Sequence, residues 1–226
     1  MIPLRDTLRP SKIPYVNYFL IGANLVVFVT ELAVPDTETF IRTWALIPAA
    51  IRLARPETLI RLLSSMFLHA GWLHVISNML FLHVFGDNVE SRLGHIRYLL
   101  CYLVWGAVAA LTQLFFSVGS TIPLLGASGA VAGVMGAYFV FFKHSSIETL
   151  VPTYLGFLTS VELPAPVILF YWFLTQIFSG SAAVVVGAGD LGGVAWFAHI
   201  GGFVGGWLSA RLFPKSDFDE PIAIEW

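Results

Sequence analysis

The stretch Leu124-Leu-Gly-Ala-Ser-Gly-Ala-Val-Ala-Gly-Val-Met-Gly-Ala-Tyr138 decides how this chain can fold. It is almost wholly apolar, yet one serine, Ser128, stands among glycines and alanines. Gly129, Gly133 and Gly136 are spaced by four and three residues, so on a helix they form one stripe of small residues. Such stripes let a second helix backbone come close inside a bilayer. The stretch therefore predicts a tightly packed membrane helix that begins at Ser128.

Ser128 has two interpretations at the start of such a helix. Its hydroxyl would lie beside backbone N–H groups that lack an acceptor within the helix, at the positive end of the helix dipole. That position suits a nucleophile whose product oxyanion must be held. A serine that only caps a packed helix has the same local sequence, so the rest of the chain has to decide between the two.

The composition indicates a membrane protein. Of the 226 residues, 57% are hydrophobic and 12% are charged, whereas an ordinary soluble domain has about 25% charged residues. A formal net charge of −2 argues against a nucleic-acid partner. The single cysteine, Cys101, can form neither a disulfide framework nor a cysteine-based zinc site. We therefore predict an all-α integral membrane protein.

Six apolar segments are expected to cross the membrane, since a crossing needs about 20 residues. They are predicted at residues 15–34, 62–85, 97–118, 128–142, 165–178 and 194–213. Residues 35–60 mix apolar side chains with arginine and glutamate and predict a first loop that is partly embedded in the membrane surface. Residues 86–96 predict a short turn, and 143–164 a long connection of unspecified shape. The chain, 1–226, is expected to form one domain, a six-transmembrane-helix bundle with short tails.

The basic residues predict the orientation of this bundle. An even number of spans puts both ends on one side, and eight of the twelve lysines and arginines fall on that side. The other four are Arg42, Arg52, Arg55 and Arg61. Positive charge gathers on the cytoplasmic side of membrane proteins. Both termini are therefore expected in the cytoplasm, with a prokaryotic cell membrane as the expected location.

Four polar side chains converge below the outer surface in this topology. Ser128 begins its helix there, and His199 lies about 10 Å down the last span at 1.5 Å per residue. His74 and Asn78 share one face of the second span because they are four residues apart. Ionisable groups at such depth usually face a bundle interior or a water-filled cavity.

The last span suggests how the histidine reaches the serine. His199, Gly202 and Gly206 share a face, so glycine packing against the fourth span would bring His199 to Ser128. A neutral imidazole there can take the serine proton, as a nucleophile and base pair requires. A core histidine satisfied by one hydrogen bond is the plain alternative.

Other chemistries have weaker support. Ala130 replaces the last glycine of a G-x-S-x-G elbow. A metal site from His69, His74, His83 and His199 is imaginable, but Asn78 stands where a zinc protease has its second histidine. His69 and His83 are expected to be structural or interfacial. A transporter or channel would more often show repeated halves with broken helices. No metal or other cofactor is expected.

Four motifs together resemble the rhomboid family of intramembrane serine proteases. Gly126-Ala-Ser128-Gly129 resembles its G-x-S-G nucleophile motif, and Ala198-His199-Ile-Gly-Gly202-Phe-Val-Gly-Gly206 its A-H-x-x-G-x-x-x-G base motif. His74-Val-Ile-Ser-Asn78 resembles its H-x-x-x-N motif, and Val89-Glu90-Ser-Arg-Leu-Gly94 its E-x-x-x-G turn. One departure is Ile60-Arg61, where the family often has Trp-Arg; the anchoring role would fall to Arg61 alone.

The resemblance implies a Ser128–His199 dyad without an aspartate. The oxyanion would be held by the Ser128 N–H, the Asn78 amide and His74. Substrates would be single-pass membrane proteins, cut near the outer end of their transmembrane helix after local unwinding. Gating would involve residues 170–178 and the following loop, 180–193. An inactive relative that only binds membrane proteins is the remaining alternative. The residues expected to pack the structure are Gly126, Gly129, Gly133, Gly202, Gly206, Arg61 and Glu90.

Overall fold

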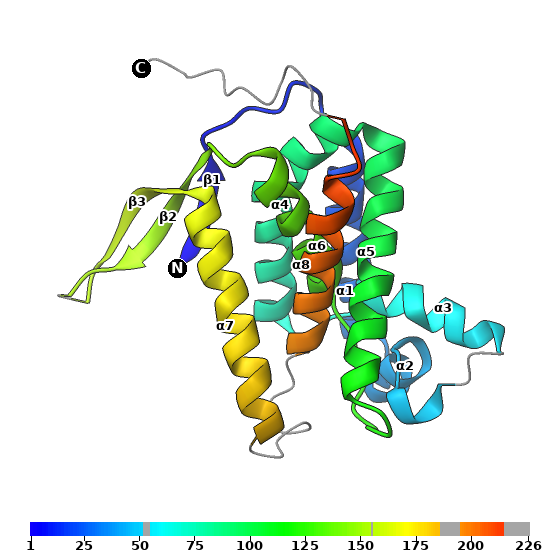
Figure 1. The fold of residues 1–226 in the computed structure, drawn as a ribbon. Coiled ribbons are helices and arrows are strands. Elements are labelled where there is room, and N and C mark those ends of the chain that lie inside the picture. The colour runs from blue at the N-terminus through cyan, green and yellow to red at the C-terminus, as the bar shows by residue number, and fades with distance from the viewer. Residues whose placement is uncertain (52–54, 155, 186–194, 215–226) are drawn as a thin grey trace.

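The computed structural model describes residues 1–51, 55–154, 156–185 and 195–214 (Figure 1). Its helices are α1 (Tyr15–Ala33), α2 (Thr37–Trp44), α3 (Pro56–Ser64), α4 (Trp72–Leu93), α5 (His95–Phe116), α6 (Ser128–Phe141), α7 (Ala165–Val185) and α8 (Trp196–Ala210). Among the described residues, α1, α5 and α7 are each long and apolar enough to cross a membrane. A fourth crossing results if Pro56–Phe67 and Trp72–Leu93, bent by 85°, count as one span. The chain is mostly helical and has several membrane-spanning helices.

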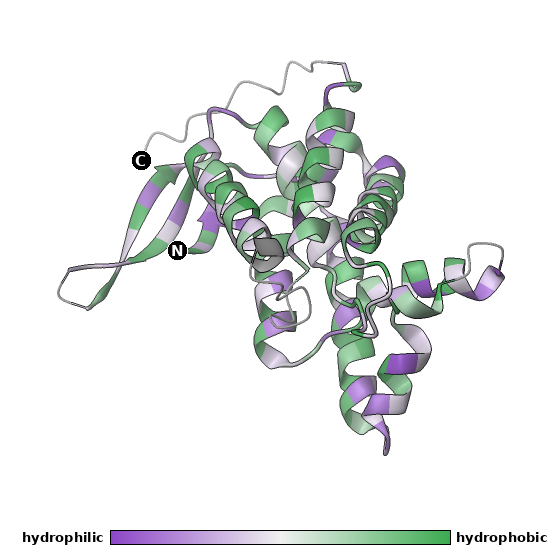
Figure 2. Cartoon of the chain, turned by 60° about the horizontal axis from the view of Figure 1, so that its bottom comes forward, coloured by the Kyte–Doolittle hydropathy of each residue, from purple (hydrophilic) through white to green (hydrophobic). Residues whose placement is uncertain are grey.

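The surface of the long helices is apolar, as a lipid environment requires. Phe19 and Val26 on α1 are 65% and 67% exposed, and Leu100 and Val104 on α5 are also exposed. Figure 2 shows hydrophobic residues along much of these helices, with hydrophilic residues in the α2–α3 segment, in the sheet and at scattered places on the bundle. The exposed apolar side chains are therefore the lipid-facing surface.

Helix α6 is the centre of the bundle. Every residue from Gly129 to Tyr138 is buried, and α4, α5, α7 and α8 all contact the helix. In Figure 1, α6 and α8 lie together in the middle, with α5 on one side and α7 on the other. A helix that is apolar all round is expected at such a buried position.

The contact between α6 and α8 is made backbone to backbone. A Cβ atom added to Gly202 would lie 2.0 Å from the Gly129 carbonyl oxygen, and one added to Gly206 would lie 1.9 Å from the Gly133 oxygen. No side chain fits at either position. The structure therefore has the expected packing of the Gly202–Gly206 face against the fourth span.

The glycine stripe on α6 (Gly129, Gly133 and Gly136) packs against two helices, α5 and α8. A Cβ on Gly129 would meet Ala109 at 2.5 Å, and one on Gly133 would meet Trp105 at 2.4 Å, both on α5. Of these three glycines, only Gly136 packs closely against α8: a Cβ atom added to it would lie 2.1 Å from the Phe203 carbonyl oxygen. The small residues of α6 thus admit two helices, one on each side.

Several predicted boundaries were wrong. The turn predicted at residues 86–96 is helical as far as Leu93, and the chain turns at Gly94 with φ +78°. Gly86 is a packing position, because its added Cβ would lie 2.2 Å from the Asn17 side-chain oxygen on α1. Helix α7 extends to Val185, so the predicted 180–193 loop begins inside a helix, and its part from 186 onward lies outside the described residues, as does Arg52.

A three-stranded sheet replaces the undefined connection at 143–164, so the fold is not wholly α-helical. Strands β2 (Ser146–Pro152) and β3 (Leu158–Pro164) form an antiparallel hairpin between α6 and α7. Strand β1 (Ile2–Asp6), from the segment expected to be a tail, pairs antiparallel with β2. The sheet order is β1-β2-β3, which leaves β3 at an edge.

Asp6 ties this sheet to the helices. Its carboxylate accepts hydrogen bonds from the Tyr138 hydroxyl, from Asn88 Nδ2 at 2.8 Å and from the Leu8 N–H at 2.9 Å. Burial raises the pKa of Asp6 to about 6 against these three donors, which lower it. The sheet is therefore fastened to the ends of α4 and α6 that lie on its side of the molecule.

The α6–α8 contact generates a stability prediction with an internal control. Gly206→Ala should lower Tm in detergent, because the new methyl group must push α8 away from the Gly133 carbonyl, and overpacking typically costs about 1–3 kcal/mol. Gly205→Ala, one residue away, has its nearest new neighbour at 3.3 Å, the Val108 Cγ1 atom. It should keep or raise Tm, since alanine is the better helix former by about 1 kcal/mol. Equal melting temperatures for the two variants would show that the helices are not in backbone contact.

Candidate active site

Ser128 and His199 lie within hydrogen-bonding distance at the core of the bundle. Ser128 is the first residue of α6, and its Oγ is 2.8 Å from His199 Nε2 on α8. The helix N-cap is Ala127, and no side chain caps the helix. The capping interpretation of Ser128 therefore fails, because the hydroxyl faces the imidazole instead of its own helix.

Gln176 determines which nitrogen of His199 carries the proton. Its amide nitrogen lies 3.2 Å from the Trp172 carbonyl and 3.0 Å from Thr175 Oγ1, so its Oε1 is left to face His199 Nδ1 at 2.7 Å. An amide oxygen can only accept, so Nδ1 must donate. Nε2 of the neutral ring is then the acceptor, and it faces the Ser128 hydroxyl.

The sequence analysis missed Gln176. The residue lies on α7 inside the apolar run 165–178 and is 5% exposed. An uncharged amide in a membrane helix matches no catalytic motif considered above. The available signal was the general one, that a polar side chain in a membrane span faces a partner within the bundle.

Aromatic rings flank His199. The Trp172 ring of α7 is 5.7 Å from the imidazole, centroid to centroid, and the Trp196 ring of α8 lies edge-on at 6.4 Å. Together with Gln176 they leave the imidazole little freedom to rotate. The ring is thus held by α7 and α8, while its partner hydroxyl belongs to α6.

His74 approaches the site from α4. An added Cβ on Gly126 would lie 2.7 Å from His74 Nε2 and 3.6 Å from Ser128 Oγ, so the imidazole faces the Ser128 end of the loop. The φ of Gly126 is +121°, which a residue with a side chain rarely adopts. Nδ1 of His74 accepts a long hydrogen bond, 3.4 Å, from the Ala70 N–H. This leaves the Nε2 proton of the neutral ring free to donate toward the site.

Asn78 lies one helical turn further along α4. It is 6% exposed, and among the described residues its Nδ2 has no hydrogen-bond partner. Leaving a buried donor unsatisfied costs about 1–3 kcal/mol. A buried amide donor without a partner, beside His74 on the same helix, is available to an incoming oxygen atom.

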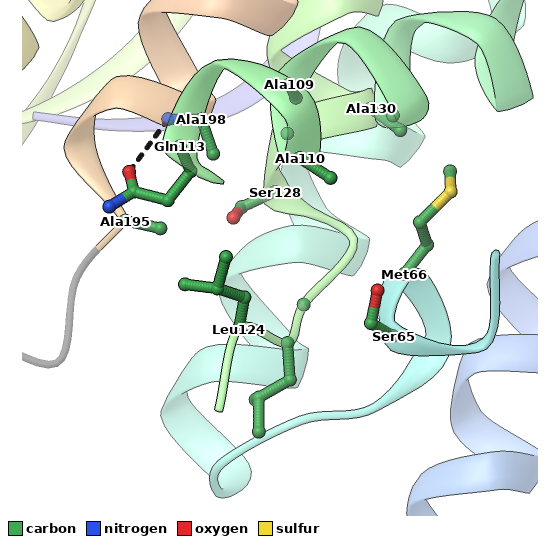
Figure 3. Close-up of a pocket in the computed structure, with 14 residues that line it drawn as sticks. Ser65, Met66, Ala109, Ala110, Gln113, Leu124, Ser128, Ala130, Ala195 and Ala198 are labelled. Carbon is green, nitrogen blue, oxygen red and sulfur yellow. Dashed lines mark hydrogen bonds between the residues drawn. The ribbon is translucent and has the colours of Figure 1, made fainter. Parts of the chain in front are cut away.

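A small pocket opens beside the serine. Its volume is about 40 Å³, room for roughly three or four water molecules at about 10–15 Å³ each. Figure 3 shows Ser128 pointing toward the space between Gln113 and Ala110 of α5, Leu124 of the preceding loop and Ala195 before α8. Gln113 Oε1 accepts the Ala198 N–H at 3.1 Å, which fixes the start of α8 against α5.

Glu90 and Arg61 lie outside this pocket. Glu90 is 1% exposed and accepts the N–H groups of Val16 and Asn17 at 3.0 and 2.6 Å, as well as His95 Nδ1 at 2.5 Å. It therefore satisfies the free donors at the start of α1. Arg61 is half-buried on α3, where it lines a separate hollow of about 240 Å³.

The histidines do not gather into a ligand set. His69 is buried, and its ring lies edge-on to the His74 ring, with 5.1 Å between the centroids. His83 is on the exposed face of α4. Over the residues that the structure describes, no group of three His, Cys, Asp or Glu side chains is placed to hold a metal ion.

Comparisons with known proteins give relatives that all carry rhomboid names. RHOMBOID-like protein 4 of Arabidopsis thaliana is 35% identical over 150 residues, 66% of this chain and 32% of the relative. RHOMBOID-like protein 6, mitochondrial, of the same plant is 32% identical over 166 residues, 71% of this chain and 46% of the relative. The rhomboid protease GluP of Bacillus subtilis is 40% identical over 77 residues, 34% of this chain and 15% of the relative. The chain spans about a third to just under half the length of these two plant relatives.

A model of the rhomboid domain family matches residues 56–216, well over half of the chain. The matched range includes Ser128, His199, His74 and Asn78. With a family match of this extent and relatives that bear the family's name, the chain belongs to the rhomboid family.

Proposed function

We propose that this protein is an intramembrane serine endopeptidase that cleaves single-pass membrane proteins near the outer end of their transmembrane helix. The observation that carries the proposal is the 2.8 Å contact between Ser128 Oγ and the unprotonated Nε2 of His199. A nucleophile needs its base within this distance, with the base oriented by a third group. Gln176 is that third group.

In the proposed reaction Ser128 attacks the scissile carbonyl and His199 takes the serine proton. His199 then returns the proton to the leaving amine, and a water molecule hydrolyses the acyl-enzyme by the same route in reverse. The oxyanion is stabilised by the Ser128 N–H, the Asn78 amide and His74, all preorganised before charge develops. The pocket beside Ser128 offers room for the water.

The membrane arrangement proposed with this activity has six spans. Helices α6 and α8, with 14 and 15 residues, are shorter than the roughly 20 residues of a full crossing. A short α6 begins below the outer surface, so Ser128 can be reached by water and by an unwound substrate. The first loop, predicted at residues 35–60, is proposed to lie partly in the membrane surface, and 1–226 is proposed to form one domain with both ends in the cytoplasm.

Which cellular membrane holds the protein is a question separate from its topology. A prokaryotic cell membrane stays a prediction, because the relatives include proteins named as mitochondrial and chloroplastic as well as a bacterial one. The proposed partners, transmembrane substrates within the bilayer, are common to all these settings. Residues 170–178 of α7 are proposed to form part of the substrate gate.

Removing either member of the dyad should abolish proteolysis without unfolding the protein. Ser128→Ala and His199→Ala should each slow cleavage of a tagged single-pass substrate in proteoliposomes by roughly 10⁴-fold or more, because the two groups act as a unit. A fluorophosphonate probe should label the wild type but neither variant. Ser117→Ala, whose hydroxyl bonds the carbonyl of Gln113 on its own helix, should label normally. A transporter, a channel or an inactive relative would show no labelling at Ser128.

Gln176 should affect turnover through His199. Gln176→Leu, of similar size, removes the acceptor for Nδ1–H and should lower kcat by roughly 10- to 100-fold, by analogy with the loss seen when the partner that orients a metal-binding histidine is removed. Gln176→Glu keeps an acceptor and should recover much of the lost rate. KM should change little in both. A Tm loss in Gln176→Leu that fully accounts for the lost activity would make the residue merely structural.

Asn78→Ala should give a slow but stable enzyme. The lost donor acts only as charge develops in the transition state, so kcat should fall by about 10²–10³-fold while KM holds. Stability should hold as well, because the Asn78 amide nitrogen has no partner among the described residues to lose. Single-turnover rates normalised to active sites, measured beside Tm, decide the matter. A falling Tm with an unchanged normalised rate would remove Asn78 from the mechanism.

A further inference from the structure

Glu31 is a buried carboxyl group near the end of α1 that the proposed reaction does not use. The residue is 1% exposed, and both of its carboxylate oxygens accept the His69 N–H, at 3.1 and 3.2 Å. In the part of the chain that the structure describes, Glu31 forms no ion pair. Burying a carboxyl group without a cation is costly, so the segment that this hydrogen bond holds is the place to look for its role.

The His69 N–H belongs to the connection between α3 and α4, residues 65–71. The start of this connection is tied to the loop that leads into α6: the Ser65 carbonyl accepts the Gly126 N–H at 2.9 Å, and Gly126 lies two residues before Ser128. Figure 3 shows Ser65 beside the pocket that Ser128 also lines. One end of the connection is therefore fixed at the candidate active site.

The other end of the connection contacts His74. The Ala70 N–H donates to His74 Nδ1 at 3.4 Å. The buried His69 ring lies edge-on to the His74 ring, and edge-on to Phe28 of α1 with 6.4 Å between the centroids. Nδ1 of His69 is 3.2 Å from the Phe67 carbonyl, which holds the ring against its own segment. A shift of the His69 main chain is thus passed on to the His74 imidazole.

We propose that Glu31 is a positioning residue, which holds residues 65–71 so that the His74 imidazole faces the oxyanion site. The inference rests on the proposed protease function, in which His74 stabilises the oxyanion. Among the described residues, α1 contributes none to the lining of the pocket beside Ser128, so its influence on the reaction is indirect. The length of the Glu31 side chain sets the distance from α1 to the His69 main chain, and a misplacement of about 1 Å can cost about 10²-fold in rate.

The test changes the charge and the length of this side chain separately. Glu31→Gln keeps the length and one acceptor oxygen, so kcat on a tagged substrate in proteoliposomes should stay close to that of the wild type. Glu31→Asp keeps the carboxylate but is one methylene group shorter, and it should lower kcat by roughly 10-fold or more while KM changes little. Thr37→Val is the matched control and should keep the wild-type kcat, because the Thr37 hydroxyl donates to the main-chain carbonyl of Glu31, at 3.1 Å, and not to its carboxylate.

A kcat that is higher in Glu31→Asp than in Glu31→Gln would overturn the proposal, because charge and not length would then matter. A second comparison uses the His74→Ala background, where Glu31→Asp should lower kcat no further, since the group that it positions is gone. An equal loss of kcat in both backgrounds would also overturn the proposal, because Glu31 would then act independently of His74.

The position of His74 is measured separately from activity. In protein labelled with ¹⁵N at its six histidines, the ring resonances of His74, assigned from His74→Ala, should shift in Glu31→Asp and stay in place in Glu31→Gln and Thr37→Val. Unmoved His74 resonances in Glu31→Asp would overturn the inference whatever the activity. A wild type that cleaves no substrate and takes up no fluorophosphonate at Ser128, but shows the expected His74 shifts in Glu31→Asp, would overturn the proposed function and support the link from Glu31 to His74.

Discussion

The close approach of two helix backbones is the constraint on which this structure depends. Gly202 and Gly206 of α8 lie against the carbonyl groups of Gly129 and Gly133 on α6. Because no side chain separates the helices, their relative height and rotation are set by rigid main chain. Ser128 is at the start of one helix and His199 lies one turn before Gly202 on the other. The hydrogen bond between them is a consequence of this packing.

The imidazole is held quite differently on its other side. Helix α7 contacts α8 through side chains, such as the stacked rings of Phe173 and Phe203, 4.7 Å apart, and through Gln176. The side-chain contacts between α7 and α8 can rearrange at a lower cost in free energy than the backbone contact between α6 and α8. The His199 imidazole thus faces Ser128, which is positioned by backbone packing, at Nε2, and Gln176, which is positioned by side-chain packing, at Nδ1.

The sequence predicted the parts of the site that depend on short spacings. Helical periodicity and the depth of each residue in its span single out Ser128, His199 and the glycines without knowledge of other contacts. Gln176 could not be found in this way, since its role depends on the rotation of α7 relative to α8. The same limit explains Gly86, which resembles a turn residue in sequence but makes room for Asn17 of α1.

The β1–β2 pairing escaped prediction because these two strands are far apart in the chain. Residues 146–164 contain strand-forming residues, but their partner, Ile2–Asp6, lies about 140 positions earlier. A short strand such as β1, with so distant a partner, gives no local signal, whereas each long helix is defined by its own apolar run. The spans were therefore predicted more reliably than the connections between them.

The position of β1 has a consequence for biogenesis. During synthesis, Ile2–Asp6 leaves the ribosome long before Ser146–Pro152, and α1, α4, α5 and α6 must be made in between. Until then β1 has no β2 to pair with, and until α6 is made Asp6 lacks Tyr138. Closure of the sheet therefore has to wait until α6 and the β2 segment have been made. A chain that stalls after α5 would expose a β1 segment without β2 and an Asp6 carboxylate without Tyr138, two features by which a quality-control protease can distinguish it from the finished protein.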